Sequence, residues 1–358
     1  MAHKSTRRDF LTGKAAPSEA PIESAGTEGR DATLETYLIR VTRRAMACEF
    51  QVVLNAGQYP NGTETALEAL DLVEALESQL SFFRPSSDIS RINLLAAEQP
   101  VELEPRLFEL LQLALKIHAE TDRAFDVTAT PLWEIWGFSR RAGRVPSDEE
   151  LAAARTYVGS HLVELDPERK TIRLKKPGVR LSLGSIGKGY ALDRCGQRLD
   201  AAGVHDYLIH GGQSSILARG TRAGTPPPPA GGVGGWSVGV PDPLRKGKHL
   251  GQVQLQNTAL ATSGSAIQFF RHKGHRYGHI LDPRTGCPTE GVLSVTVLAP
   301  TAALADALST AFYVLGPEGA QKYCQTRPEI AAVLVCPSRS GTDVEVLSIG
   351  LRQDELRA

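Results

Sequence analysis

The chain has 358 residues, with 40 Lys and Arg against 40 Asp and Glu and a hydrophobic content of 41%. This is the composition of a globular protein that can bury a large core, and the balanced charge argues against a nucleic-acid surface, which usually has a basic excess. The five cysteines are scattered without a C-x-x-C pair, so neither a disulfide framework nor a zinc site is expected. No apolar run is long enough to span a membrane.

The N-terminal segment contains S-T-R-R-D-F-L, which has the form of a twin-arginine export signal. A working signal continues into an apolar stretch, but here the chain continues T-G-K-A-A-P-S-E. We therefore interpret residues 1–34 as a disordered leader with a degenerate twin-arginine motif. A single domain is expected over residues 35–355.

Strands and helices follow one another from Tyr37 onward, outside any regular β-α-β alternation. Strands are predicted at 37–41, 49–54, 162–165, 171–174, 179–183, 207–209, 215–218, 236–240, 252–256, 292–299, 330–335 and 344–348. Five helices are predicted. The first follows Gly62 and has an apolar side formed by Leu67, Leu70, Val73, Leu76 and Leu80, and the second begins at Pro105. The third begins at a capping box of Ser147 and Glu150 and runs to about residue 157, and the last two cover 184 to Gly203 and 304–315. The pattern indicates an α+β fold with mixed or antiparallel sheets packed against helices. Residues 222–235 are rich in Pro and Gly and are expected to form an exposed loop.

Three stretches of small residues follow predicted strands. L-G-S-I-G-K-G-Y-A-L-D-R at 183–194 opens a helix, where backbone N–H groups and Lys188 would suit an anion, although tight packing of strand against helix explains it equally well. H-G-G-Q-S-S at 210–215 and A-T-S-G-S at 261–265 are predicted to be further turns. Around one cleft, such turns would let the backbone approach a phosphorylated ligand closely.

Two features between residues 275 and 316 have a chemical character. His279 stands just before a D-P-x-T-G turn, which could hold the imidazole at a set distance from a ligand. Asp306 and Thr310 are four residues apart in a helical pattern, so a carboxylate and a hydroxyl share one face and suit a hard cation such as Mg²⁺. Taken alone, the histidine could be structural and the aspartate could cap a helix or form a salt bridge.

The motifs, taken in order from Met46 to Gly316, resemble those of the FAD:protein FMN transferases, the ApbE-type flavin transferases. They include M-A-C, L-S-F-F-R-P-S-S-D-I-S-R-I-N, F-D-V-T-A-T-P-L-W-E-I-W-G-F, L-G-S-I-G-K-G-Y-A-L-D, W-S-V-G-V-P-D-P, A-T-S-G, H-I-L-D-P-R-T-G and A-D-A-L-S-T-A-F-Y-V-L-G. The resemblance implies an ApbE-like, T-fold-like catalytic domain.

The resemblance also implies a reaction and a set of site residues. FAD would be bound with Mg²⁺, and its FMN moved onto a Ser or Thr hydroxyl of an acceptor protein, expected to be a redox protein, with release of AMP. His279 would be the catalytic base. Asp306, Thr310 and a backbone carbonyl near Ser185 would hold Mg²⁺. The FAD site would be formed by Met46, Phe83, Ala124, Phe125, Asp126, Ser182, Lys188 and Ile280.

The chain departs from the family pattern at three positions. Phe83 stands where the family usually has tyrosine, Ser182 where it has aspartate, and Gln213 where it has aspartate or asparagine. Two alternatives therefore stay open: a pyrophosphatase that splits FAD into FMN and AMP, and a non-catalytic FAD-binding protein. Because no apolar core follows the Arg-Arg pair, a bacterial cytoplasmic location is favoured, with the periplasm as the alternative.

Overall fold

A computed structural model describes residues 37–140, 142–224, 234–245, 247–265, 268–338 and 343–351, all of which belong to one unit of the chain. The predicted leader at 1–34 and most of the loop predicted at 222–235 lie outside these residues. Among the described helices, none combines the length and the apolar character needed to cross a bilayer.

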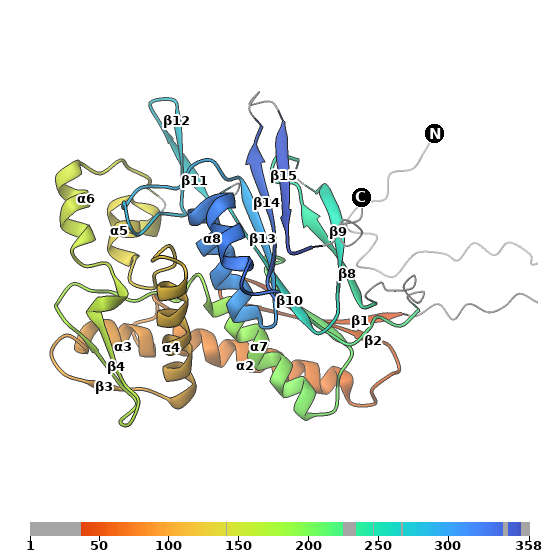
Figure 1. The fold of residues 1–358 in the computed structure, drawn as a ribbon. Helices are drawn as coiled ribbons and strands as arrows, with labels where there is room; N and C mark the ends of the chain where they lie inside the picture. The colour runs from red at the N-terminus through yellow and green to blue at the C-terminus, as the bar shows by residue number, and fades with distance from the viewer. Residues whose placement is uncertain are drawn as a thin grey trace, which may run out of the picture. The chain divides into compact units, whose positions relative to one another are not determined.

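An eight-stranded antiparallel sheet forms the centre of this unit (Figure 1). Its strands, in spatial order, are β1 (Leu38–Ala45), β2 (Cys48–Asn55), β6 (Tyr207–Gly211), β7 (Ser215–Arg219), β10 (Thr258–Gly264), β13 (Ser294–Ala299), β14 (Ala331–Pro337) and β15 (Val344–Ile349). Every neighbouring pair is antiparallel. Together with the helices described next, this sheet confirms the predicted α+β class.

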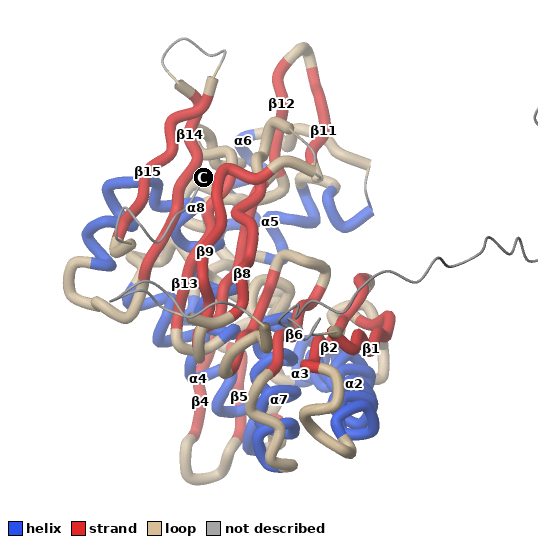
Figure 2. The backbone as a smooth tube through the Cα atoms, turned by 90° about the vertical axis from the view of Figure 1, so that its right-hand side faces the viewer, coloured by secondary structure: helices blue, strands red, loops and turns tan. Residues whose placement is uncertain are grey.

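Three helices cover one face of the sheet, and a hairpin covers the other. The helices are α2 (Gly62–Leu80), α7 (Gly187–Ala201) and α8 (Ala302–Cys324). The hairpin is β8 (Trp236–Pro241) with β9 (His249–Leu255), which lies across the sheet in Figure 2. Successive strand residues alternate between the two sides. In β2, Val52 packs in the helix-side core, whereas Val53 packs with Trp236 of the hairpin.

The remaining elements surround one end of the helical layer. They are α3 (Asp88–Leu95), α4 (Pro105–Glu120), α5 (Thr130–Ile135), α6 (Asp148–Arg155), the 3₁₀ turns Phe138–Arg140 and Ser160–Leu162, a three-stranded sheet of β3 (Val101–Glu102), β5 (Thr171–Leu174) and β4 (Val163–Asp166), and a hairpin of β11 (Phe269–His272) with β12 (His275–Gly278). The predicted capping box is present, since the Ser147 and Glu150 side chains each bond the other's backbone N–H.

The strand predicted at 179–183 is wrong. Leu181 is buried, but its backbone N–H donates to Asn93 Oδ1 and its carbonyl accepts from Asn93 Nδ2. The next N–H, of Ser182, donates to the carbonyl of Val127. An asparagine side chain thus takes the place of a strand partner, so the segment is extended without belonging to a sheet.

Three other features differ from the sequence-based reading. A-T-S-G-S is not a turn, because Ala261 to Gly264 form the second half of β10. The stretch L-S-F-F-R-P-S-S-D-I-S-R-I-N, for which the sequence predicts no helix, contains α3, whose N-cap Ser87 accepts from the Ser90 N–H. Leu67 is 42% exposed, so the buried side of α2 passes through Ala66 and Leu70 instead.

Candidate active site

The Asp306 carboxylate joins three separate parts of the chain. Its Oδ2 accepts from the backbone N–H of Gly189 (2.9 Å), and its Oδ1 accepts from the hydroxyl of Ser215 (2.8 Å). The ammonium of Lys188 lies 3.9 Å from Oδ1. Asp306 is only 6% exposed, so this buried charge is compensated by two hydrogen bonds and one cation.

Thr310 lies one turn further along α8, as its spacing predicted. Its Oγ1 is 3.2 Å from Ser263 Oγ, which is also 2.8 Å from Ser309 Oγ. Ser215 and Ser263 come from the two small-residue stretches at 210–215 and 261–265. Both stretches therefore contact the helix that carries Asp306 and Thr310.

The start of α7 lies directly against the start of α8. A Cβ added to Gly189 would lie 2.0 Å from the carbonyl oxygen of Ala302, so no other residue fits there without moving the backbone. This close approach brings the Gly189 N–H to Asp306. Ser185 lies in the turn that precedes α7, and Lys188 lies in its first turn. The stretch around Gly189 thus packs tightly against α8, as one of the two interpretations of its sequence expects, and binding of an anion by Lys188 stays a prediction.

His279 follows β12 and is partly buried. Its Nδ1 is 3.1 Å from the carbonyl oxygen of Gln268, which also accepts from the His279 backbone N–H (3.3 Å). A carbonyl can only accept, so Nδ1 carries the proton and Nε2 keeps its lone pair. Burial lowers the pKa of His279, and the charge of Lys188 lowers it further, against the opposing effect of the Gln268 hydrogen bond. A neutral imidazole with a free Nε2 is suited to accept a proton.

Met46 and Ala47 form the tight turn between β1 and β2, both with positive φ (49° and 60°). A two-residue hairpin turn requires positive φ at both central residues, which costs of order 1 kcal/mol for each non-glycine residue. Burial raises the pKa of the next side chain, Cys48, while Lys188 lowers it and Asp306 raises it. The turn that carries Met46 therefore lies within electrostatic range of the Asp306 carboxylate.

The segment Ala124 to Asp126 presents mainly its backbone. The side chains of Ala124 and Phe125 are each 1% exposed and belong to the core. Asp126 accepts at Oδ1 from the N–H and hydroxyl of Thr128, and its Oδ2 is 3.2 Å from His118 Nδ1. Because these side chains have partners within the protein, only backbone groups and a remaining lone pair of Asp126 could bind a ligand.

The other predicted FAD residues differ in exposure. Ser182 is linked by its N–H to the carbonyl of Val127, which joins it to the Ala124–Asp126 segment. Ile280 is buried, at 7% exposure. Phe83 is 69% exposed and meets Phe82 edge to face (5.3 Å).

The oxygen atoms around Asp306 fit a magnesium ion that is completed by substrate phosphates. Among the described residues, no group of three or more His, Cys, Asp and Glu could hold a metal by itself. Mg²⁺ is commonly bound by one or two carboxylates together with phosphate oxygens and water. Both Asp306 oxygens accept hydrogen bonds, but each has a second lone pair, and the Thr310 hydroxyl lies one helical turn away.

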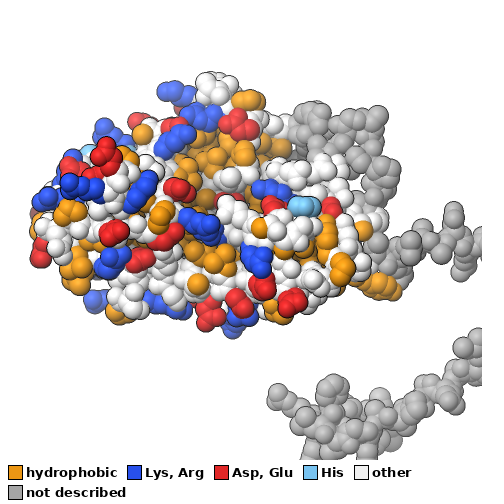
Figure 3. Space-filling view, turned by 90° about the horizontal axis from the view of Figure 1, so that it is seen from below, with side chains coloured by type: hydrophobic (Ala, Val, Ile, Leu, Met, Phe, Trp, Pro, Cys, Tyr) orange, Lys and Arg blue, Asp and Glu red, His pale blue; other side chains and the backbone are white. Residues whose placement is uncertain are grey.

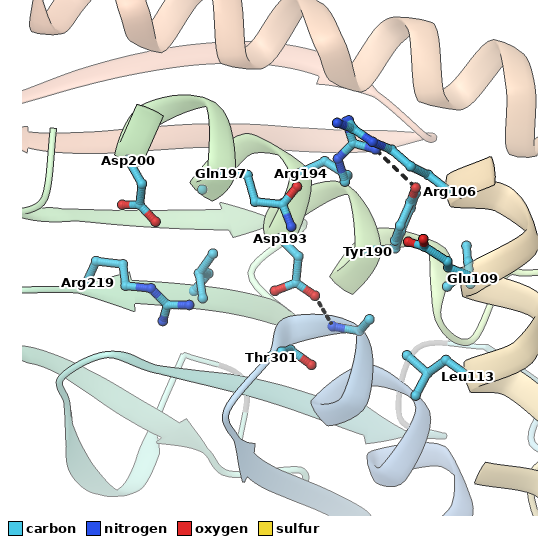
Figure 4. Close-up of a pocket in the computed structure, with 14 residues that line it drawn as sticks. Arg106, Glu109, Leu113, Tyr190, Asp193, Arg194, Gln197, Asp200, Arg219 and Thr301 are labelled. Carbon is cyan, nitrogen blue, oxygen red and sulfur yellow. Dashed lines mark hydrogen bonds between the residues drawn. The ribbon is translucent and has the colours of Figure 1, made fainter. Parts of the chain in front are cut away.

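A separate pocket of about 250 Å³ lies on another side of α7 (Figure 4). Its lining includes Arg106, Tyr190, Asp193 and Arg194, and none of the predicted site residues. Asp193 accepts from the N–H groups of Ala302 and Ala303 (2.8 Å each), which satisfies two donors at the start of α8. Burial raises the pKa of Asp193 to about 6 despite these bonds. Asp193 thus supports the helix that carries Asp306.

Comparison with known proteins places this arrangement in a family. The model of the ApbE family matches residues 46–334. The chain belongs to the ApbE family. The predicted resemblance is confirmed, and with it the classification of the chain as a transferase.

Relatives and solved structures of the ApbE family cover most of the chain. It is 32% identical to the FAD:protein FMN transferase of Vibrio cholerae over 69% of this chain and 72% of that protein. It is 28% identical to the one of Haemophilus influenzae over 86% of this chain and 89% of that protein. The apo crystal structure of Pseudomonas stutzeri flavinyl transferase ApbE has a TM-score of 0.76 at 30% identity, covering 90% and 98% of the two chains. The Thermotoga maritima ApbE structure has a TM-score of 0.74 at 30% identity, covering 86% and 96%.

Three site residues of this ApbE-family chain escaped the sequence analysis: Gly189, Ser215 and Ser263. Their signal was present as small residues after predicted strands, but small size alone does not indicate a hydrogen bond to a helix 40 to 120 residues later. Gln213 has a φ of 60°, a conformation for which asparagine and aspartate are favoured. The aspartate or asparagine that the family resemblance implies at this position would suit this backbone conformation.

Proposed function

We propose that this chain transfers FMN from FAD to a Ser or Thr hydroxyl of an acceptor protein, in a Mg²⁺-dependent reaction that releases AMP. The observation that supports the proposal is the Asp306 carboxylate, which lies beside Lys188 and one helical turn from the Thr310 hydroxyl, with Lys188 also within electrostatic range of His279. The names of the curated relatives, FAD:protein FMN transferase, support the same reaction.

His279 would act as the general base. The Gln268 carbonyl accepts from its Nδ1–H, which leaves Nε2 with a lone pair that can take a proton. The acceptor hydroxyl oxygen would form a bond to the phosphorus of the FMN half of FAD as the bond between that phosphorus and the AMP oxygen breaks. The hydroxyl proton would pass to His279 Nε2, and AMP would leave with the electrons of the broken bond.

Lys188 and the first turn of α7 would bind the pyrophosphate of FAD. The N–H groups of Gly187 and Gly189 already donate to Leu183 and Asp306, so the attraction for an anion would come from the helix dipole and from the full positive charge of Lys188. Asp306, Thr310 and the Ser185 carbonyl would hold Mg²⁺, which when bound supplies neutralisation of the charge that develops on the pyrophosphate. The hydrogen bonds from Gly189 and Ser215 keep the carboxylate in place for this role.

The flavin and adenosine parts of FAD would contact the remaining predicted residues. The exposed ring of Phe83 can stack on an aromatic ligand, and Met46 carries a polarizable thioether in the turn between β1 and β2. Backbone groups of Ala124 to Asp126, with Ser182 and Ile280, would complete the site. Each of these assignments can be tested by replacing the residue singly and measuring the affinity for FAD.

The first experiment is to incubate the purified chain with FAD and Mg²⁺, with and without a threonine-bearing acceptor domain of the type that ApbE-family transferases modify. AMP release and covalent flavin on the acceptor are both followed. Appearance of both products, and their loss on chelation of Mg²⁺, is the expected result. AMP without flavin on the acceptor would instead indicate a FAD pyrophosphatase, and bound FAD without either product would indicate a binding protein.

The assignment of the base is tested by His279→Ala, with His205→Ala as a matched control on an exposed histidine that pairs with Asp200. Transfer should fall by about 100-fold or more in the first variant, within the range of general-base catalysis. It should be unchanged in the second. Full transfer activity in His279→Ala would assign the base elsewhere.

A further inference from the structure

The β11–β12 hairpin has an unusual concentration of positive charge. Arg271, Lys273 and Arg276 are all exposed, and His272 and His275 flank the turn. Lys273 and Gly274 form the turn with positive φ (49° and 80°), as a two-residue hairpin requires. In Figures 1 and 2 the hairpin tip extends beyond the neighbouring helices α5 and α6.

Like charges lie opposite each other across this hairpin. Arg271 pairs directly with Arg276. Directly opposed like charges destabilise a pair of strands. Among the described residues, no carboxylate lies within ion-pair distance of Arg271, Lys273 or Arg276, whereas His275 meets Glu290 (2.8 Å). The hairpin therefore keeps an unfavourable charge arrangement that an external anionic group would relieve.

The opposite face of the hairpin is fixed to the protein by aromatic rings. Phe270 and Tyr277 stack on each other (5.2 Å, 18°), and Tyr277 also lies 5.5 Å from the ring of Trp136, which follows α5. Side chains alternate along a strand, so Phe269, Arg271 and Arg276 share the other face. There Phe269 is 41% exposed, and the guanidinium of Arg276 lies 4.1 Å from its ring centroid. One face is thus an anchor and the other an open surface of cations and one aromatic ring.

This open surface adjoins the candidate base. Gly278 ends β12 and His279 follows it directly. On the other strand, at the same end of the hairpin, Gln268 precedes β11, and its carbonyl oxygen accepts from both the backbone N–H and the Nδ1–H of His279. A partner bound along the hairpin would therefore extend toward the imidazole.

We propose that the β11–β12 hairpin binds an acidic segment of the acceptor protein that flanks the modified hydroxyl. This inference rests on the proposed function, because it assigns a docking surface for the acceptor of that reaction. A protein segment fits better than nucleic acid, since the chain as a whole has no basic excess, and charges of both signs are interspersed over the face shown in Figure 3. The pyrophosphate of FAD has its own cation in Lys188.

The test uses two short fluorescent peptides, each with a single threonine, flanked by Asp and Glu in one and by Lys in the other. Binding to the full chain saturated with FAD is measured by anisotropy at low and at physiological ionic strength. The variant is Arg271→Glu with Lys273→Glu. Because a glutamate at 271 faces Arg276, this change creates a favourable cross-strand pair and should not lower the melting temperature.

Arg169→Glu with Arg173→Glu is the matched control, since it makes the same change in net charge at exposed positions beside and within β5. The acidic peptide should bind at least about tenfold more tightly than the basic one at low salt, with a smaller ratio at higher salt. The hairpin variant should abolish this preference, and the control should keep it. Affinity for FAD should stay the same in both.

Several results would overturn the docking surface: no preference between the peptides, an equal loss in the control, or a parallel loss of FAD affinity. Tighter binding of single-stranded DNA or anionic lipid vesicles than of the acidic peptide would also do so. Binding of the peptides is measured independently of the transfer reaction. A preference for the acidic peptide without any flavin transfer would therefore refute the proposed function alone. Equal flavin transfer to both peptides would refute the docking surface alone.

Discussion

Replacing Asp306 by asparagine or by alanine should separate its structural role from its proposed metal-binding role. In the alanine variant, the buried N–H of Gly189 and the buried hydroxyl of Ser215 both lose their acceptor. Each unsatisfied donor costs about 1–3 kcal/mol, so the free energy of unfolding should fall by about 2–6 kcal/mol.

Asparagine has nearly the same shape and can satisfy both partners. Its Oδ1 would accept from the Gly189 N–H, and its Nδ2 would donate to Ser215 Oγ, because a hydroxyl can also accept. The stability of Asp306→Asn should therefore lie within about 1 kcal/mol of the unmodified chain. The negative charge that would attract Mg²⁺ is absent, however, so turnover at saturating FAD should fall by about 100-fold or more, equivalent to about 2.7 kcal/mol in the barrier.

The assay combines urea unfolding with AMP release measured over a range of Mg²⁺ concentrations. Asp306→Glu serves as a comparison that keeps the charge but moves it by one methylene. If Asp306→Asn kept both its turnover and its Mg²⁺ dependence, the carboxylate would serve only to join α7, β7 and α8. A loss of activity that simply followed the loss of stability across the three variants would lead to the same conclusion.

Three further predictions concern single residues. Burial lowers the pKa of His279, and the base must be neutral to accept a proton. The rate of FMN transfer should therefore be constant near neutral pH and fall only as the pH drops through a value below 6.5. A rate that already falls above pH 7 on the acid side of the profile would contradict this. Burial raises the pKa of Asp193 to about 6, so its protonated form is favoured on folding, and its contribution to stability should be lost as pH rises from about 4 to about 6. In Asp193→Asn, the free energy of unfolding measured with urea should no longer fall by this contribution of about 3 kcal/mol between pH 4 and pH 6. If its pH dependence were unchanged by the substitution, the raised pKa of Asp193 would be refuted. Gln213→Asn should raise the free energy of unfolding by up to about 1 kcal/mol, and with it the melting temperature, because asparagine tolerates positive φ better than glutamine. A lower melting temperature would show that the glutamine side chain makes a specific contact.

The sequence predicted most of the sheet because its strands carry β-branched and aromatic residues, as in β2 and β13. It failed for β10, where the small residues from Ala261 to Gly264 look like a turn. These residues are small because α8 packs directly on this strand, which is a tertiary requirement that no local pattern contains. At Leu181 the error was the opposite one, because an apolar extended segment is satisfied by the Asn93 side chain instead of a neighbouring strand.

The site was predictable to the extent that it depends on local spacing or on motif resemblance. Asp306 and Thr310 share a helix face because they are four residues apart. The bond from Ser215 to Asp306 spans 91 residues, and the one from Gly189 spans 117, so neither can be inferred from periodicity. The orientation of His279 likewise depends on Gln268, which is separated from it by the whole hairpin.

These long sequence separations bear on the order of events during folding. Contacts between distant residues form slowly, because closing long loops costs chain entropy before the contact is gained. The carboxylate of Asp306 is held only when α7, β7 and α8 have met, so the site has no local precursor in the chain. In refolding from denaturant, affinity for FAD and Mg²⁺ should therefore appear with the slowest phase that forms native structure, well after most helical signal has returned.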